Sequence, residues 1–345
     1  MKRFDYVLMG LLVLLVTVLC LVAPQGVSAN PIPDLQAELE RLMQIGEEDF
    51  TPVPGGIIRL GNQGERVRIL TERLQDFYPE IEVTDEFTEA VKKVVKRYQT
   101  DSGLGVDGIV GPQTRAALNF SVQDKIRLIR QSVAYLEDID FFERYILVNI
   151  PSQEMVAYWW NIEQIRSRVI AGRPKYSTPL MTTNLYSVKY NPDWSVPPGI
   201  TRRYRTKLIK EGSSYFRNKG IMISYNSQGQ ATFYQPPGPN NALGRLKFEL
   251  DNNKSIFMHD TNASYLFERP TRLYSSGCVR VQAYQELAAW VLNENVDYVI
   301  NNIRTGRTYW EKVEKPVPVH IVYVQAWPNE LGQINYYPDV YGKNG

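Results

Sequence analysis

The apolar residues of this 345-residue chain change their spacing near residue 145, and that change limits the folds open to it. In residues 57–140 they recur at three- and four-residue steps, as in Val67, Leu70 and Leu74, which predicts amphipathic helices. Short runs of β-branched and aromatic residues follow, separated by Gly, Pro and Asn, which predicts strands. We therefore expect an α+β multidomain protein, with a helical unit followed by a mainly β unit.

The N-terminus predicts export. Lys2 and Arg3 precede an apolar run over 7–23, and small residues at 27–29 end the segment, as in a secretory signal peptide. The apolar run is also long enough to serve as an uncleaved inner-membrane anchor, and both interpretations stay open. Either one places the rest of the chain outside the cytoplasm, in the periplasm or cell envelope.

Shifts in composition divide the chain into five segments. They are a signal peptide or anchor over 1–29, a linker over 30–56, a helical domain over 57–120, a connecting helix over 121–144 and a mainly β domain over 145–345. Within the last segment, we expect helices over 204–212 and 282–293. The loop-rich residues 225–246 are expected to frame an active site, because long loops in compact domains are usually functional or disordered.

Charge and cysteine content limit the classes of function that fit this chain. The formal net charge of +2 gives no strong field that would indicate a nucleic-acid partner. Of the two cysteines, Cys20 lies in the targeting segment, so Cys278 is alone in the exported part and can form no internal disulfide. A lone thiol there is either reactive or a small buried hydrophobe, and its neighbours must decide.

The neighbours of Cys278 favour a nucleophile, which needs a base or a positive environment. His259 ends an apolar strand 19 positions earlier, whereas His320 lies in a Val/Ile-rich strand and reads mainly as a sheet residue, with a place in the site as the alternative. Gly277 permits close approach of a substrate, and the amides of Gly277 and Cys278 could hold an oxyanion. Arg280 could bind a substrate carboxylate, favour the thiolate, or form a structural salt bridge.

The two serines before Gly277 have two open interpretations. Ser275 and Ser276 could orient His259, or they could only cap the turn that carries the candidate nucleophile.

The helical domain carries glycines and apolar residues in a distinctive order. The pattern runs Leu60-Gly61-x-x-Gly64-x-x-Val67, then Ala90-Val91-Lys92, Tyr98-Gln99 and Gly103-Leu104-x-Val106-Asp107-Gly108-x-Val110-Gly111-x-x-Thr114-x-x-Ala117-Leu118-Asn119. It resembles the three-helix peptidoglycan-binding domain. The resemblance implies adhesion to cell-wall polymer, with a purely structural helical cap as the alternative.

The β domain carries a second resemblance. Its blocks are His259-Asp260-Thr261, Arg272-x-x-Ser275-Ser276-Gly277-Cys278-Val279-Arg280-Val281, Asn191-Pro192-x-Trp194-x-Val196-Pro197-Pro198, Pro237-Gly238-Pro239-x-Asn241-Ala242-Leu243-Gly244 and Val322-Tyr323-x-x-Ala326-Trp327. They resemble the L,D-transpeptidase catalytic domain of the YkuD type, in its large Gram-negative branch. Ser276 stands where the common form of the family has His, which leaves the immediate support of the nucleophile open.

This resemblance implies a reaction without metal or cofactor. Cys278 would attack the meso-diaminopimelate carbonyl of a donor tetrapeptide stem, His259 would move the protons, and D-Ala would leave. The amine of an acceptor stem would then open the thioester and give a 3→3 cross-link. Arg280 would fix the nucleophile loop or a substrate carboxylate, Trp194 and Tyr274 are candidate walls, and carbapenems would acylate Cys278.

Other functions fit less well. A sortase places its Arg well beyond its Cys, and a cysteine-peptidase hydrolase of the wall usually has Cys before His. A non-enzymatic wall-binding protein would not explain a lone exported thiol in this motif. The acceptor stays open, because a relative could attach a lipoprotein or exchange D-amino acids, and any cell-wall synthase partner is unknown.

Overall fold

The computed structural model describes residues 31–45, 50–141, 143–160, 162–329 and 331–343. The predicted signal peptide or anchor over 1–29 lies outside these residues. Among the helices that are described, none combines the length and the apolar character needed to cross a membrane.

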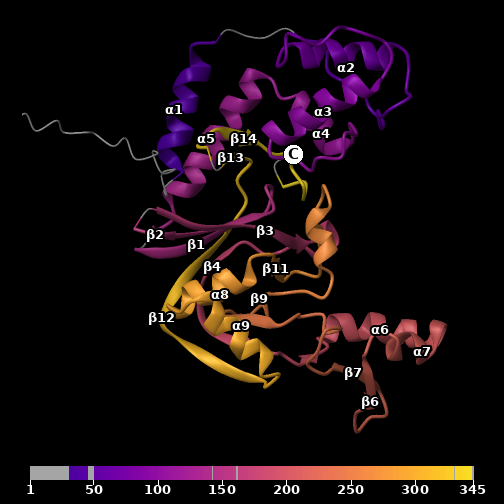
Figure 1. The fold of residues 1–345 in the computed structure, drawn as a ribbon, viewed down its shortest axis with the longest axis vertical. Helices are drawn as coiled ribbons and strands as arrows, with labels where there is room; N and C mark the ends of the chain where they lie inside the picture. Colours follow the sequence, from indigo (N-terminus) through magenta and orange to yellow (C-terminus); the bar gives the residue numbers. More distant parts are fainter. Residues whose placement is uncertain (1–30, 46–49, 142, 161, 330, 344–345) are drawn as a thin grey trace, which may run out of the picture.

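Helices form the first part of the chain, and further helices lie beside the strands of the second part (Figure 1). Their bounds are α1 (Ile32–Met43), α2 (Glu65–Gln75), α3 (Glu89–Asp101), α4 (Pro112–Leu118), α5 (Val122–Glu137), α6 (Pro198–Glu211), α7 (Ser214–Arg217), α8 (Tyr284–Leu292) and α9 (Val296–Arg304), with 3-10 turns η1 (Pro174–Tyr176) and η2 (Ser264–Glu268).

Strands of the second part form one large mixed sheet, which within the described residues has nine members in the order β10-β3-β11-β9-β8-β4-β12-β1-β2. Their bounds are β1 (Arg144–Asn149), β2 (Glu154–Trp159), β3 (Ile162–Gly172), β4 (Met181–Tyr190), β8 (Leu246–Leu250), β9 (Met258–His259), β10 (Leu273–Ser275), β11 (Val279–Val281) and β12 (Tyr309–Val322). Two small sheets hold β5 (Trp194–Ser195), β6 (Met222–Tyr225) and β7 (Ala231–Gln235), and β13 (Ala326–Pro328) with β14 (Ile334–Tyr336). The mainly β character predicted for this part is confirmed.

The predicted helical unit contains α2, α3 and α4 around a core of its own. Thr88 begins α3 by accepting a hydrogen bond from the Val91 N–H, and Pro112 opens α4, where its missing N–H costs little. Val67, Leu70 and Leu74, whose spacing predicted α2, are fully buried. These helices lie at the end of the molecule away from α6 and α7 (Figure 1).

Two details of the β part differ from the prediction. The helix expected over 204–212 is α6, which begins at Pro198 because a proline in the first turn suits a helix start. The segment 225–246, expected as loop, contains β7, which pairs with β5 and β6.

One face of the large sheet is apolar along its length. Val188, Phe248, Met258 and Val279 are lateral partners on β4, β8, β9 and β11, and all are fully buried. Helices α8 and α9 cover this face in a shared core. Each such side chain contributes roughly 1.5–3 kcal/mol by leaving water, so this face anchors the strands that carry the site.

The opposite face is divided into two halves. Over β1, β2 and β12 it is apolar, and α1, α5 and the β13–β14 hairpin pack against Tyr145, Leu147 and Tyr158. Over β8, β9 and β11 the lateral partners are Lys247, His259 and Arg280. A cavity lies over this polar half, and His259 and Arg280 line it.

Candidate active site

Strand pairing brings the two residues of greatest chemical interest together. In the parallel pair β9–β11, Met258 is opposite Val279 and His259 is opposite Arg280. Since side chains alternate along a strand, Cys278, just before β11, shares the face of Arg280 and hence of His259. As diagonal neighbours on adjacent strands, His259 and Cys278 have backbones roughly 7–8 Å apart, within reach of an imidazole and a thiol. Both line one cavity of about 590 Å³.

A backbone carbonyl orients the imidazole. His259 Nδ1 donates to the main-chain oxygen of Asp260, which leaves Nε2 as the nitrogen that can accept a proton. His259 is buried, and burial followed by the positive charge of Arg280 lowers its pKa to about 3. The ring is therefore neutral at physiological pH, as a proton acceptor must be.

The thiol of Cys278 is half-buried and protonated. Its sulfur lies 3.8 Å from the main-chain oxygen of Ser255, the acceptor of a weak hydrogen bond. Burial raises its pKa to about 11, against smaller opposing effects of a backbone hydrogen bond from Phe257 and the charges of Lys247 and Arg280. The resting pair is thus a neutral thiol beside a neutral imidazole.

A short hydrogen-bonded turn holds the sulfur in place. The Gly277 N–H donates to Ser275 Oγ at 3.1 Å, and the Ser275 hydroxyl donates to the Cys278 carbonyl at 2.5 Å. Gly277 has a φ of +123°, which disfavours any residue with a Cβ. Ser275 therefore caps the turn, one of the two roles considered. The Gly277 amide is engaged, whereas the Cys278 amide has no acceptor among the described residues and remains available to an oxyanion.

Arg280 is a cation without a carboxylate partner in the described part of the chain. Its Nη1 donates to Thr261 Oγ1 at 3.3 Å, and its Nε is buried with no acceptor. Burial lowers its pKa, although not enough to discharge a guanidinium. Of the roles considered for Arg280, a structural salt bridge is not found among the described residues, and a charge that faces the thiol or a substrate anion remains.

The cavity walls include one of the two predicted wall residues. Trp194 lines the cavity and packs edge-on against Tyr204 of α6 at 6.5 Å between ring centroids. Tyr274 does not line it: it lies where the register of β10 shifts against β3, and its side chain is exposed. Ser276 is exposed at the rim and contacts arginines rather than His259.

His320 lies elsewhere. It is in β12, where Thr182 Oγ1 is 3.0 Å from its Nδ1, and β8 and β4 separate β12 from β9. Strands lie about 4.8 Å apart, so His320 is roughly 14 Å from the candidate site. It does not line the cavity.

Several cavity residues had no sequence motif. Arg173 and Tyr176 come from the turn after β3, and Ser255 from the loop before β9. Arg203 and Lys207 are four residues apart on α6, so they share one helix face over the cavity. That spacing was the available signal, but it fits any solvated helix equally well.

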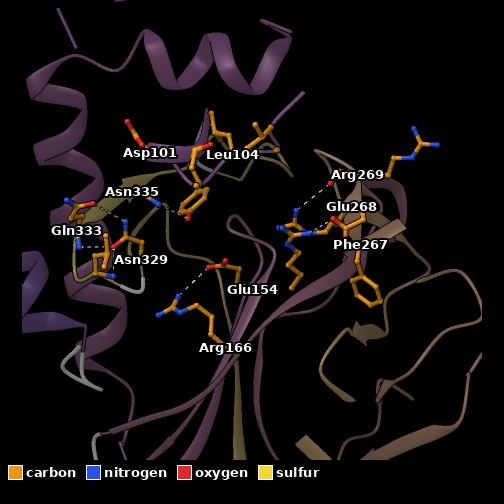
Figure 2. Close-up of a pocket in the computed structure, with 18 residues that line it drawn as sticks. Asp101, Leu104, Glu154, Arg166, Phe267, Glu268, Arg269, Asn329, Gln333 and Asn335 are labelled. Carbon is orange, nitrogen blue, oxygen red and sulfur yellow. Dashed lines mark hydrogen bonds and ion pairs between the residues drawn. The ribbon is translucent and has the colours of Figure 1, made fainter. Parts of the chain in front are cut away.

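A second cavity, of about 470 Å³, lies where α3 and the loop after it meet the β part (Figure 2). Two of the four arginines that line it have carboxylate partners: Arg166 lies 3.4 Å from Glu154, and Arg168 lies 2.7 Å from Glu268. It contains neither His259 nor Cys278. Among the described residues, no group of three or more His, Cys, Asp or Glu side chains gathers as metal ligands would.

Comparison with known proteins assigns both parts of the chain. Residues 143–321 match the family model YkuD, described as "L,D-transpeptidase catalytic domain", and residues 63–118 match one described as "Putative peptidoglycan binding domain". A curated Haemophilus influenzae protein, described as "Putative L,D-transpeptidase", is 30% identical over 241 residues. The match covers 64% of this chain and 48% of that protein, so the chain spans about half the length of this relative.

Solved structures give more distant similarities. An L,D-transpeptidase of Xylanimonas cellulosilytica is 16% identical, with 79% of this chain and 100% of that chain covered and a TM-score of 0.29. One of Stackebrandtia nassauensis is 12% identical, with 79% and 97% covered and a TM-score of 0.32.

Proposed function

Since this chain belongs to the YkuD family of L,D-transpeptidase catalytic domains, we propose that it forms 3→3 cross-links between peptidoglycan stem peptides. The proposed nucleophile is Cys278 and the proposed base is His259. The observation that carries the proposal is their position on one face of neighbouring strands, in one cavity and beside Arg280. The match of residues 63–118 to a peptidoglycan-binding domain supports the choice of substrate.

In the first half of the proposed reaction, the Cys278 sulfur bonds to the diaminopimelate carbonyl carbon of a donor tetrapeptide. His259 Nε2 takes the thiol proton, and the Cys278 N–H donates to the oxyanion. Collapse breaks the carbon–nitrogen bond, and His259 returns the proton to the departing D-Ala amine. A thioester remains on Cys278.

In the second half, the side-chain amine of an acceptor diaminopimelate attacks the thioester carbon. His259 takes a proton from that amine, the carbon–sulfur bond breaks, and the proton passes to the Cys278 sulfur. The product is a 3→3 amide bond, and the enzyme regains its neutral pair. Since neither ion is favoured in the resting cavity, proton transfer accompanies attack instead of preceding it.

We also propose that the chain acts in the cell envelope. The N-terminal sequence predicts export, with residues 1–29 as a cleaved signal peptide or a retained inner-membrane anchor. The peptidoglycan-binding segment would hold the enzyme on its polymeric substrate.

Incubation with a purified disaccharide-tetrapeptide, followed by mass analysis, tests the proposal. We expect a dimer that has lost one D-Ala, absent with Cys278→Ala and retained with His320→Gln, which alters a histidine outside the cavity. A carbapenem should add its full mass to the unmodified enzyme and leave Cys278→Ala unchanged. Cross-linking by Cys278→Ala would rule out the proposed nucleophile.

The same measurement separates the possible acceptors. A tripeptide without dimer would indicate that water is the acceptor and that the enzyme is an L,D-carboxypeptidase. Exchange of the terminal residue for an added D-amino acid, or transfer to a lipoprotein lysine, would identify the other acceptors.

A further inference from the structure

Among the described residues, the lining of the active-site cavity carries more positive than negative charge. None of the described residues that line it is Asp or Glu, and five are basic: Arg173, Arg203, Lys207, Lys254 and Arg280. Lys207 is balanced by Glu211 at 2.8 Å. The second cavity differs, because Asp101, Glu154 and Glu268 line it beside its arginines. The active-site cavity therefore has an excess of positive charge that favours an anionic ligand.

Two of these cations converge on one neutral group. Arg203 Nη2 donates to Ser276 Oγ at 3.0 Å, and Arg173 Nη2 donates to the same oxygen at 3.4 Å. Neither guanidinium has a carboxylate partner among the described residues. Two like charges that share a hydroxyl repel each other, and an anion between them would relieve that repulsion.

The ring of Tyr176 positions both guanidiniums. The Arg203 guanidinium carbon is 4.6 Å from its centroid and that of Arg173 is 5.2 Å away, which are cation–π distances. The backbone supports the arrangement, since the Arg173 N–H donates to the Ser275 carbonyl at 3.2 Å. The two planar forks thus lie side by side on one aromatic ring, which suits bidentate recognition of a carboxylate.

The pair also lies close to the reacting bond. Ser276 is two residues from Cys278, so their Cα atoms are at most about 7 Å apart. An anion on the two guanidiniums would therefore lie within the reach of a stem peptide whose carbonyl Cys278 attacks. A tetrapeptide donor has two carboxylates near that carbonyl: the terminal one of D-Ala, one residue on, and the distal one of diaminopimelate, at the end of its side chain.

We infer that Arg173 and Arg203 form a carboxylate clamp that selects donor stems with a free carboxylate near the scissile bond. The inference rests on the proposed function, whose donor it specifies. An amidated donor places a neutral group between two cations and loses the charged hydrogen bonds. Such bonds contribute enough that their loss weakens binding roughly 10- to 100-fold.

Binding to the Cys278→Ala protein tests the clamp without turnover. Three disaccharide-tetrapeptides are compared by calorimetry: the free acid, one amidated at the distal diaminopimelate carboxyl, and one that ends in D-alaninamide. We expect one amide to bind roughly 10- to 100-fold more weakly than the free acid, and that amide identifies the carboxylate held. Adding Arg203→Gln should remove the difference.

Arg202→Gln is the matched control, because Arg202 is the neighbouring α6 arginine, is exposed, and does not line the cavity. It should keep the discrimination. Should Arg203→Gln fail to fold, Arg173→Gln makes the same test from the other side of Ser276. Equal affinity of Cys278→Ala for all three donors, or an equal loss for all three in Arg203→Gln, would overturn the clamp.

Failure of the clamp can be distinguished from failure of the proposed function. Cross-linking by the unmodified enzyme, read from the dimer mass, tests the function by itself. Discriminating binding without any dimer would refute the function and leave the clamp standing. Dimer formation without discrimination would do the reverse.

Discussion

At the candidate nucleophile, burial raises the pKa of the thiol and nearby positive charge lowers it, and burial has the larger effect. The pKa of the Cys278 thiol is about 11 despite Lys247 and Arg280, and His259 beside it is neutral. We therefore expect iodoacetamide to alkylate Cys278 at a rate that rises about tenfold per pH unit from pH 7 to 10, without a plateau. Intact-mass kinetics measure this, with free cysteine as the control. A plateau below pH 7 would indicate a preformed thiolate–imidazolium pair.

Ser275 contributes through the turn it caps. Ser275→Ala leaves the Gly277 N–H and the Cys278 carbonyl without their partner, and each unsatisfied buried group costs about 1–3 kcal/mol. We expect a comparable fall in the free energy of unfolding, measured in urea, and a lower acylation rate by a carbapenem, because the sulfur is less well held. Ser275→Thr, which keeps the hydroxyl, should restore most of both. An unchanged acylation rate in Ser275→Ala would show that the cap does not position Cys278.

At the scale of elements, the sequence predicted those parts of the site that depend on residues close together in the chain. A strand that ends at His259 and a turn that carries Cys278 were readable from local pattern, and the pairing of β9 with β11 joins them. The clamp was not readable, because Arg173 and Arg203 come from separate elements that meet only in the folded chain. Tyr274 was wrongly expected to line the cavity for a related reason, since the register shift of β10 against β3 arises from pairing with a distant strand.

Protonation of a buried histidine on β12, His320, should lower the stability of the fold in acid. His320 is buried with its Nε2 unpartnered, and burial lowers its pKa from 6.5 to about 4. Between these values the unfolded chain binds more protons, so the free energy of unfolding is highest above pH 6.5 and falls toward pH 4. At pH 5 the loss from His320 is about 2 kcal/mol. Buried His259, with a pKa of about 3, adds a loss of the same sign.

The substitution His320→Gln removes this titration and keeps a polar group beside Thr182. Urea unfolding at pH 7 and pH 5 should show that the variant loses about 2 kcal/mol less than the unmodified protein between the two values. Equal losses in both proteins would mean that His320 is not the group that titrates.

At the scale of the whole molecule, the helical unit contacts the β part just before β10. Gly105, in the loop after α3, packs so closely on Pro270 that a Cβ would overlap its backbone. Close by, Thr271 Oγ1 donates to Gln113 Oε1 at 3.0 Å. Residues 270–272 lead directly into β10 and the turn of Cys278. The helical unit therefore rests on the segment that supports the candidate nucleophile, beside the cavity of Figure 2.

Gly105→Ala should open this junction. The new methyl group meets backbone that cannot give way, and overpacking of this kind costs typically 1–3 kcal/mol unless the two parts separate. We expect a larger radius of gyration by small-angle X-ray scattering and slower acylation of Cys278 by a carbapenem. Gly111→Ala is the matched control, because open space surrounds that glycine and its φ is −86°. If Gly105→Ala kept the radius of gyration and the acylation rate of the unmodified protein, the close packing at this junction would not be needed to position Cys278. A larger radius with unchanged acylation would show instead that the β part holds Cys278 in place by itself.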